Sequence, residues 1–511
     1  MPVSSITTSR TYLTQQLGAL NDKLAEKTTQ LASGKVGSTY GEIGDRRLLD
    51  IELTQKVSMI ETYQQTITIA NLHLETATMS LERLEDIRRD AKSALDTNDF
   101  VIQDDGQTQT QSRAELLLSE TLNILNTEIA GYYVFGGTDA VNDPVAPLED
   151  ILNGSGSLSG LRDYMDEFAS ANLGSANTGR TSTSALTTNY AGLVPTDSTF
   201  TIAEDGAHDF GFDIASVAST LSNVTVTGPL AADPDSFDVQ FTGQPALGET
   251  ISVELSLPPD HTDTITIEFT AASNTEEEGT FQIGADLEET AQNLRDALAT
   301  EIEAQAQTTL RAVSDEWAAE EFFSTYSGEE PQRIDGPPYD TATALTAGGS
   351  TTVEWYTGRN TTTTDPRTDK NAVVDGNLTV EYGIRANETP LKELVQSLAA
   401  FVAADFSGGT QTDEEYYNAL SANLRTTLQP PGVDQSGIVD ISTDIAISYR
   451  TASMTNDRHV QIKSSYEGTI AEIEGVDKDQ LAAEILTLQN NIEVSYRASS
   501  IVFNLSLSDY L

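Results

Sequence analysis

The chain contains no cysteine, and basic residues are scarce. Without cysteine it cannot form disulfides, thiolate metal sites or a cysteine nucleophile. Its 28 Lys and Arg residues stand against 79 Asp and Glu, which gives a formal net charge of −51. A chain with this much negative charge repels nucleic-acid phosphates and anionic lipid headgroups at long range. We therefore expect neither nucleic acid nor membrane as a partner.

Long apolar runs are also missing. No stretch approaches the roughly 20 consecutive apolar residues that a transmembrane helix needs. The first ten residues, MPVSSITTSR, lack the charged segment and following apolar segment that mark a secretory signal peptide. These absences predict a protein that is cytosolic or is exported by a route that leaves no cleaved signal.

The familiar catalytic motifs are absent from the sequence. No HExxH, GxSxG or P-loop pattern occurs. Four histidines share no metal-ligand spacing, namely His73, His208, His261 and His459. We expect no catalytic residue, no metal and no cofactor, and therefore no enzyme.

Apolar residues at helical spacing dominate residues 1–142. An opening helix is expected to end at Gly34. It carries a stripe made of Leu13, Leu17, Leu20, Leu24 and Leu31. A second helix is predicted from Arg47 to Leu95, because a seven-residue repeat typical of coiled coils persists there. This heptad stripe comprises Ile60, Tyr63, Ile67, Ala70, Leu74, Ala77, Leu81, Leu84, Arg88, Ala91 and Leu95. At about 1.5 Å per residue the helix would be roughly 70 Å long, which suits a rod better than a compact globule.

A third helical stripe is predicted to return antiparallel to this helix. It consists of Leu118, Leu122, Leu125, Ile129 and Tyr132.

The last zone, residues 383–511, again shows helical spacing. Thr389 and Pro390 suggest an N-cap followed by the first helical residue. A long helix is expected from Ile438 to a break at Gly475. Asp477 and Gln480 then resemble a capping box before a final helix. Its stripe and apolar end comprise Leu481, Ile485, Leu488, Ile492, Phe503, Leu505, Leu507, Tyr510 and Leu511.

The middle zone, residues 143–382, differs in kind. Alternating runs at 237–241, 251–255 and 265–269 predict half-buried strands, and Asp286 is expected to cap a helix. No Lys or Arg occurs between Arg180 and Arg295, so we expect this acidic segment to lie in water on the outside of any assembly. The prediction is a mainly α protein: a long coiled-coil-like helical rod formed by the N- and C-terminal segments, with a β-rich α+β insert of one or two subdomains.

Four short motifs in this arrangement resemble those of the flagellin family. After the first helix, residues 31–35 read LASGK, and residues 132–138 read YYVFGGT. After the insert, residues 382–387 read YGIRAN, and the chain closes with LSLSDYL. Residues 40–48, YGEIGDRRL, depart from the filament-type segment and are closer to the junction-type proteins of alphaproteobacteria, which link hook and filament. The resemblance covers the two helical zones and not the insert.

The resemblance implies a structural subunit of the bacterial flagellum, extracellular and exported through the flagellar type III apparatus. Implied partners are further copies of the chain in the flagellar axial structure, hook-associated protein 1, flagellin and a flagellar export chaperone. The leucines and apolar residues of the two end stripes would form the polymer interface. The family-motif residues are Tyr132, Phe135, Gly136, Gly137, Thr138, Gly383 and Arg385.

Two alternatives stay open at this point. The chain could be a filament flagellin that builds the propeller itself, or a flagellin-like protein whose insert binds a ligand.

Overall fold

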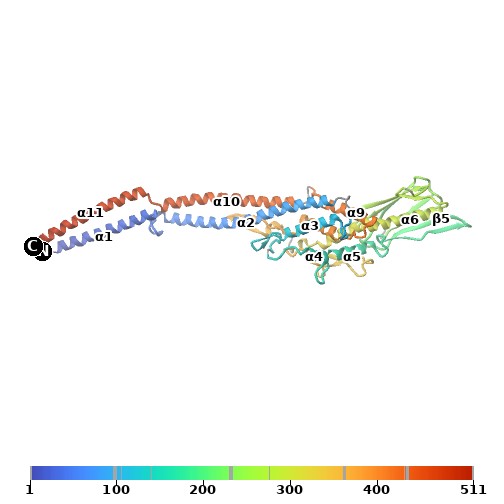
Figure 1. The fold of residues 1–511 in the computed structure, drawn as a ribbon, viewed down its shortest axis with the longest axis horizontal. Helices are drawn as coiled ribbons and strands as arrows, with labels where there is room; N and C mark the ends of the chain where they lie inside the picture. The colour runs from blue at the N-terminus through green and yellow to red at the C-terminus, as the bar shows by residue number, and fades with distance from the viewer. Residues whose placement is uncertain are drawn as a thin grey trace. The chain divides into compact units, whose positions relative to one another are not determined.

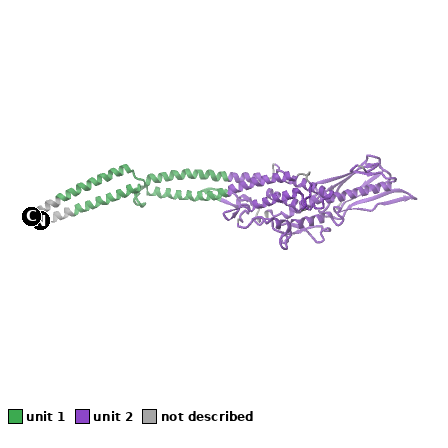
Figure 2. Ribbon diagram, viewed as in Figure 1, with its two compact units in different colours: residues 1–72, 372–380, 449–511 green, residues 73–371, 381–448 purple. Residues whose placement is uncertain are grey.

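The structure is a computed structural model (Figure 1). It describes residues 3–95, 100–104, 106–139, 141–229, 234–275, 277–360, 364–430, 432 and 437–508, with side chains throughout except at 3–10, 327 and 502–508. Two compact units, coloured separately in Figure 2, divide the chain. Unit 1 comprises residues 1–72, 372–380 and 449–511, and unit 2 comprises 73–371 and 381–448. These divisions fall elsewhere than 142/143 and 382/383, so the three zones stay a prediction.

Unit 1 consists of paired helices and a short hairpin. α1 (Val3–Ser33) packs against α11 (Lys478–Ser508). The first part of α2 (Arg47–Ala94) lies beside the last part of α10 (Ile438–Glu474), where Lys463 Nζ is 2.8 Å from Glu61 Oε1. The hairpin joins β14 (Asn371–Asp375) to β15 (Leu378–Glu381).

The turn after α1 is fixed to the turn before α11. The Val36 N–H donates to the carbonyl of Glu474, and the Val476 N–H donates to that of Gly34. The ammonium group of Lys35 also pairs with the Glu474 carboxylate at 2.6 Å. Both helix breaks, at Gly34 and Gly475, therefore belong to one local structure.

Unit 2 contains most of the helices and both larger sheets. Its own helices are α3 (Gln109–Leu125), α4 (Leu148–Asn153), α5 (Leu161–Leu173), α6 (Leu287–Gln305), α7 (Arg311–Phe322), α8 (Thr389–Ala403) and α9 (Gln411–Thr427). Shorter helical turns are η2 (Ala306–Leu310), η3 (Tyr326–Gly328) and η4 (Pro366–Asp369), and unit 1 adds η1 (Gly44–Arg46).

One sheet has the order β11-β10-β9-β6, and the other has the order β3-β5-β8-β7 with β4 also on β5. The strands are β3 (Thr181–Thr183), β4 (Thr187–Ala191), β5 (Val194–Glu204), β6 (Asp213–Ser219), β7 (Val224–Thr227), β8 (Ser236–Phe241), β9 (Thr250–Ser256), β10 (Thr264–Ala272) and β11 (Thr280–Gln282). Two-stranded pairs are formed by β1 (Glu128–Ile129) with β2 (Tyr132–Tyr133), and by β12 (Gln332–Ile334) with β13 (Leu345–Ala347).

The core of this region follows the alternation seen in the sequence. In β8, Phe237, Val239 and Phe241 are buried while the residues between them are exposed. They share one apolar cluster with Leu294 and Leu298 of α6. The apolar residues at every second position of the strands and at every third or fourth position of the helix therefore face the same interior.

Several predicted elements are confirmed. α1 ends at Ser33, α2 spans Arg47–Ala94, and α10 ends at Glu474. The three predicted strands are β8, β9 and β10, and the Asp286 side chain accepts a hydrogen bond of 2.9 Å from the Glu289 N–H. All members of the heptad stripe on α2 are buried except Tyr63, which is half-buried.

Three details of the sequence analysis are wrong. The third stripe leaves the helix at Leu125, and Ile129 pairs with Tyr132 across the β1–β2 hairpin instead. The N-cap of α8 is Glu388, one residue before Thr389. Asp477 does cap α11, but the Gln480 amide donates to Glu484 rather than back to the cap, so no capping box forms.

Candidate functional site: the contact between the motif segments

Two motif segments that lie far apart in the sequence meet in unit 2. Gly136 and Arg385 form an antiparallel bridge. The Gly137 N–H donates to the Ile384 carbonyl at 3.0 Å, and the Ala386 N–H donates to the Phe135 carbonyl at 2.9 Å. We call residues 132–138 and 383–388, paired in this way, the motif contact.

The glycines of the motif contact are required by close packing. A Cβ added at Gly136 would lie 2.1 Å from the carbonyl oxygen of Asp139, and one at Gly383 would lie 2.2 Å from that of Pro366. Non-bonded atoms do not approach this closely, so a side chain at either position would force the backbone to shift. Gly137 has a φ of +62° as well, a conformation that L-residues with a Cβ rarely adopt.

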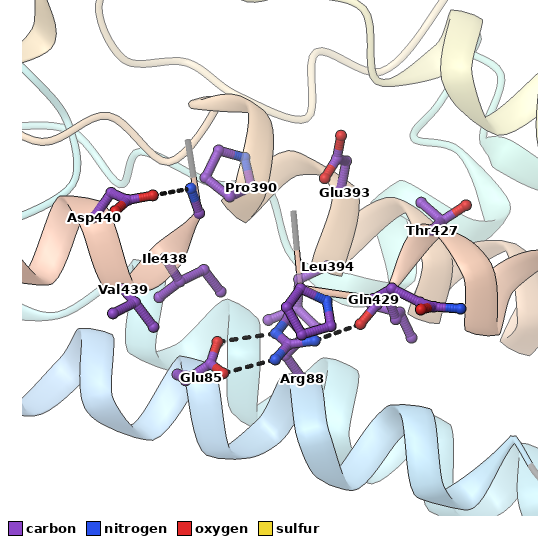
Figure 3. Close-up of a pocket in the computed structure, with 13 residues that line it drawn as sticks. Glu85, Arg88, Pro390, Glu393, Leu394, Thr427, Gln429, Ile438, Val439 and Asp440 are labelled. Atoms are coloured by element: carbon purple, nitrogen blue, oxygen red, sulfur yellow. Dashed lines mark hydrogen bonds and ion pairs between the residues drawn. The ribbon is translucent and has the colours of Figure 1, made fainter. Parts of the chain in front are cut away.

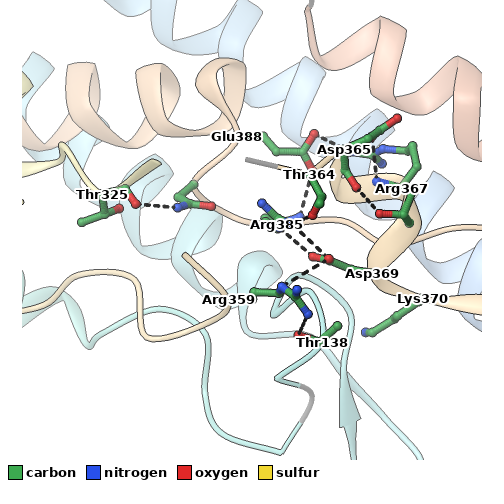
Figure 4. A network of polar contacts seen from close by, with 12 residues as sticks. Thr138, Thr325, Arg359, Thr364, Asp365, Arg367, Asp369, Lys370, Arg385 and Glu388 are labelled. Atoms are coloured by element: carbon green, nitrogen blue, oxygen red, sulfur yellow. Dashed lines mark hydrogen bonds and ion pairs between the residues drawn. The ribbon is translucent and has the colours of Figure 1, made fainter. Parts of the chain in front are cut away.

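Arg385 is the buried centre of the motif contact (Figure 4). Its guanidinium donates to both carboxylate oxygens of Asp369, at 2.6 and 3.0 Å, and the two side chains are only 1% and 2% exposed. Arg359 approaches the same carboxylate at 3.6 Å and donates to the Thr138 hydroxyl at 2.9 Å. This fork-to-fork geometry gives strong, directional hydrogen bonds. It joins the first motif segment to the second through the loop between them.

Two further charges complete the network. Glu388 accepts from the Arg385 N–H at 2.8 Å and pairs with Arg367. Burial raises the pKa of the Glu388 carboxyl, although Arg367 opposes this. Lys370 donates to the carbonyls of Tyr133 and Val134, and burial lowers the pKa of its ammonium group to about 8.

Nearly all of these charges bind one another, so the network is suited to holding chain segments together rather than to catalysis. Tyr132 is exposed at the edge of the contact, and Phe135 is fully buried beneath it.

The motif residues can be recognised from the sequence, whereas their partners cannot. Asp369, Arg359, Lys370, Arg367 and Glu388 were not singled out. A usable signal was present in DPRTDK at 365–370, since four charges in six residues end a segment that is otherwise poor in basic residues. Nothing local in the sequence, however, shows which distant backbone such a cluster contacts.

A second charged contact ties α2 to the end of α9. The guanidinium of Arg88 donates to Glu85 at 2.7 and 2.9 Å and to the carbonyl of Leu428, beside a cavity of about 210 Å³ (Figure 3). Leu394 and Ile438 supply apolar walls. Because all three nitrogens of the Arg88 guanidinium already donate a hydrogen bond, this contact also holds chain segments together.

The residues proposed for the polymer interface lie in unit 1. The five leucines of the α1 stripe are half-buried, as are Ile485 and Leu488, whereas Leu481 and Ile492 are buried. Since α1 and α11 pack against each other, these stripes mark the faces on which the two helices meet within one chain. The apolar tail is not placed: Tyr510 and Leu511 lie outside the described residues, and the side chains of Phe503, Leu505 and Leu507 are not described.

Neither a scan against models of protein families nor a search of curated proteins found a match to this chain. None of the described helices combines the length and apolar content needed to cross a membrane. Within the described residues, no group of three or more His, Cys, Asp or Glu side chains is arranged to hold a metal ion.

Proposed function

We propose that this protein is a non-catalytic structural subunit of the bacterial flagellum. Its helical ends form a coiled-coil-like rod that polymerises with further copies of the chain. Its place is the junction between hook and filament, in contact with hook-associated protein 1 and flagellin. The protein reaches this place, outside the cell, through the flagellar type III export apparatus.

The observation that carries the proposal is the outer surface of unit 1. Each of its long helices has an apolar stripe that is at least half-buried where side chains are described, and each also leaves large apolar side chains exposed to solvent. They are Tyr12, Leu48, Leu49, Met59, Ile69, Leu72, Tyr449, Met454, Val460, Leu486, Val494, Tyr496 and Ile501. Exposed apolar residues are ordinary when scattered singly, but this density on paired helices is typical of surfaces that another protein covers.

The expected occupant of these faces is a second copy of the chain. Paired helices have little interior, because each helix contacts only one long neighbour, and isolated helices are marginal in water. Neighbouring subunits would cover the remaining faces along the same helices and offset the entropy lost on ordering them. The acidic insert, which carries both larger sheets, would stay outside such an assembly, where its carboxylates keep their water.

The motif contact supports the same reading. It joins the chain before the insert to the chain after it through backbone hydrogen bonds, at glycines that tolerate no Cβ. The buried pair of Arg385 with Asp369 also fixes the end of the insert to this contact. An insert held at its base in this way can vary without disturbing the helical ends. This is the organisation that the resemblance to flagellins implies.

The proposal is tested by charging the helix faces. Ile69 on α2 and Met454 on α10 are 61% and 63% exposed, so Ile69→Lys with Met454→Lys should leave the monomer's melting unchanged, as surface changes usually do. The variant gene is returned to a strain that lacks the native one, and motility and filaments are examined by electron microscopy. We expect loss of both.

The matched control is Leu193→Lys in the insert. Leu193 is 96% exposed, so this change also replaces a solvent-exposed apolar side chain by lysine. It should assemble normally. The proposal is wrong if the helix-face variant restores motility as well as the control does. The alternative, a filament flagellin, shares this outcome and is separated from the junction protein by copy number along the flagellum.

A further inference from the structure

A polar cavity of about 370 Å³ lies in unit 2, away from the motif contact. Its charged lining comes from Arg162 and Asp166 of α5, Arg311 and Asp315 of α7, and Asp405 in the loop before α9. Tyr416 of α9 forms part of the wall. The volume lies within the range of about 300–1,000 Å³ that is usual for small-molecule sites.

Arg311 presents an unused guanidinium to this cavity. Its guanidinium carbon lies 4.4 Å above the ring of Tyr416, which fixes the orientation of the group. Among the described residues, no oxygen accepts a hydrogen bond from it. The nearest acid on its own helix, Asp315, is buried and accepts from the Tyr416 hydroxyl instead. Burial raises the pKa of Asp315 to about 7, so near neutral pH this carboxyl only partly balances the charge of Arg311.

Acidic groups of the same cavity are also available. Asp166 has no hydrogen bond or ion pair with any described residue. Its side chain is largely exposed, but the carboxyl is partly shielded from water, which raises its pKa, with Arg311 opposing. Asp405 accepts from the Ser407 N–H at 2.9 Å, and its bonds to Ser407 lower its pKa, so this carboxylate stays ionised. Arg162 is exposed and already donates to Asn153. Besides Arg162, the cavity therefore holds Arg311 as a fixed cation and Asp166 and Asp405 as anions, and within the described residues Arg311 forms no hydrogen bond or ion pair with either carboxylate.

We propose that this cavity binds a small zwitterionic molecule. Its carboxylate would pair with the guanidinium of Arg311, and its ammonium group would lie between Asp166 and Asp405. A planar guanidinium can bind a carboxylate through two parallel hydrogen bonds. A simple anion would meet the repulsion of Asp166 and Asp405, and a simple amine would meet that of Arg311. Only a ligand that carries both charges satisfies both sides. The proposal is independent of the assembly role.

The test measures binding to the purified full-length chain by isothermal titration calorimetry. The probes are the series of ω-amino acids from glycine to ε-aminocaproate, with butyrate, butylamine and inorganic phosphate for comparison. One member of the series, set by the distance between the two charges, should bind at least about ten-fold more tightly than butyrate, butylamine or phosphate, since a charge-assisted contact is worth a tenfold change or more.

Two variants identify the contacts. Arg311→Gln should lower the affinity of the best ω-amino acid to that of butylamine, and Asp166→Asn should lower it to that of butyrate. Asp166 is exposed, so its variant should fold even if Arg311→Gln does not. Asp163→Asn removes an exposed charge from the same helix without touching the cavity and should bind as the wild type does.

The proposal is overturned if phosphate or butyrate binds as tightly as every ω-amino acid, because the site would then be a plain anion site. It is equally overturned if butylamine binds as tightly, or if no member of the series binds at concentrations up to about 1 mM.

Discussion

Neutralising Asp369 should destabilise unit 2 far more than such a small change in the side chain would otherwise do. Asp369→Asn keeps the shape of the side chain but removes the charge that balances Arg385, which is 1% exposed. Arg359, 3.6 Å away, loses the same partner. Removing one member of a buried ion pair leaves an uncompensated charge and costs about 3–5 kcal/mol. We expect a loss of this size in the free energy of unfolding, measured by urea denaturation followed by circular dichroism.

The chain offers a matched control of the same geometry at the surface. The guanidinium of Arg83 on α2 donates two hydrogen bonds, of 2.6 and 2.8 Å, to the carboxylate of Glu120 on α3. The two side chains, however, are 43% and 41% exposed. Water solvates either partner when the other is lost, so Glu120→Gln should cost at most about 1 kcal/mol. The two pairs share their hydrogen-bond geometry, and the large difference between them is burial.

A second variant separates the charge from the packing. Replacing both partners, Asp369→Leu with Arg385→Met, removes the buried charges together and should be less destabilising than Asp369→Asn alone. Equal losses for Asp369→Asn and Glu120→Gln would refute the reasoning, because the motif contact would then not depend on its buried charges.

Three further changes test other parts of the molecule. Leu74→Ala truncates a fully buried member of the heptad stripe and should cost about 2–5 kcal/mol in denaturant unfolding, whereas Glu75→Ala, exposed beside it, should stay within about 0.5 kcal/mol. Burial raises the folded-state pKa of Asp315 to about 7, so folding retains a proton that the unfolded chain releases near pH 4, and stability should fall between about pH 4 and pH 7 by on the order of a few kcal/mol. Asp315→Asn should lack that part of the pH dependence, and an unchanged profile would exclude Asp315 as its source. Deleting residues 502–511 should leave a soluble, exported monomer that fails to assemble, as seen by secretion assay and electron microscopy.

The long helices could be predicted because their signal is local and repeated. α2 carries the heptad stripe through most of its length, so its predicted ends differ from the observed ones by at most one residue. Helical spacing is a poor guide where only two or three residues carry it. Ile129 and Tyr132 continue the spacing of α3, yet they face each other in a two-residue hairpin pair with Ala130 and Gly131 at positive φ between them. Spacing alone cannot distinguish these arrangements.

The candidate site was only half visible in the sequence. Motif residues such as Gly383 were found through resemblance, and the structure gives the physical reason for them in the absence of space for a Cβ. Asp369 and Lys370 were missed because their partners lie more than two hundred positions away or across a loop without periodicity. Long-range ion pairs depend on the complete fold, so no local pattern predicts them.

The central claim is tested most directly by where the protein lies on the cell. Immunogold labelling of intact flagella with an antibody against the acidic insert should give one site of label on each flagellum, near the cell where hook and filament meet. Label along the whole shaft would instead identify a filament flagellin. Cells whose flagella carry no label at all, while the antibody detects the protein elsewhere, would contradict the proposal that this chain is a flagellar subunit.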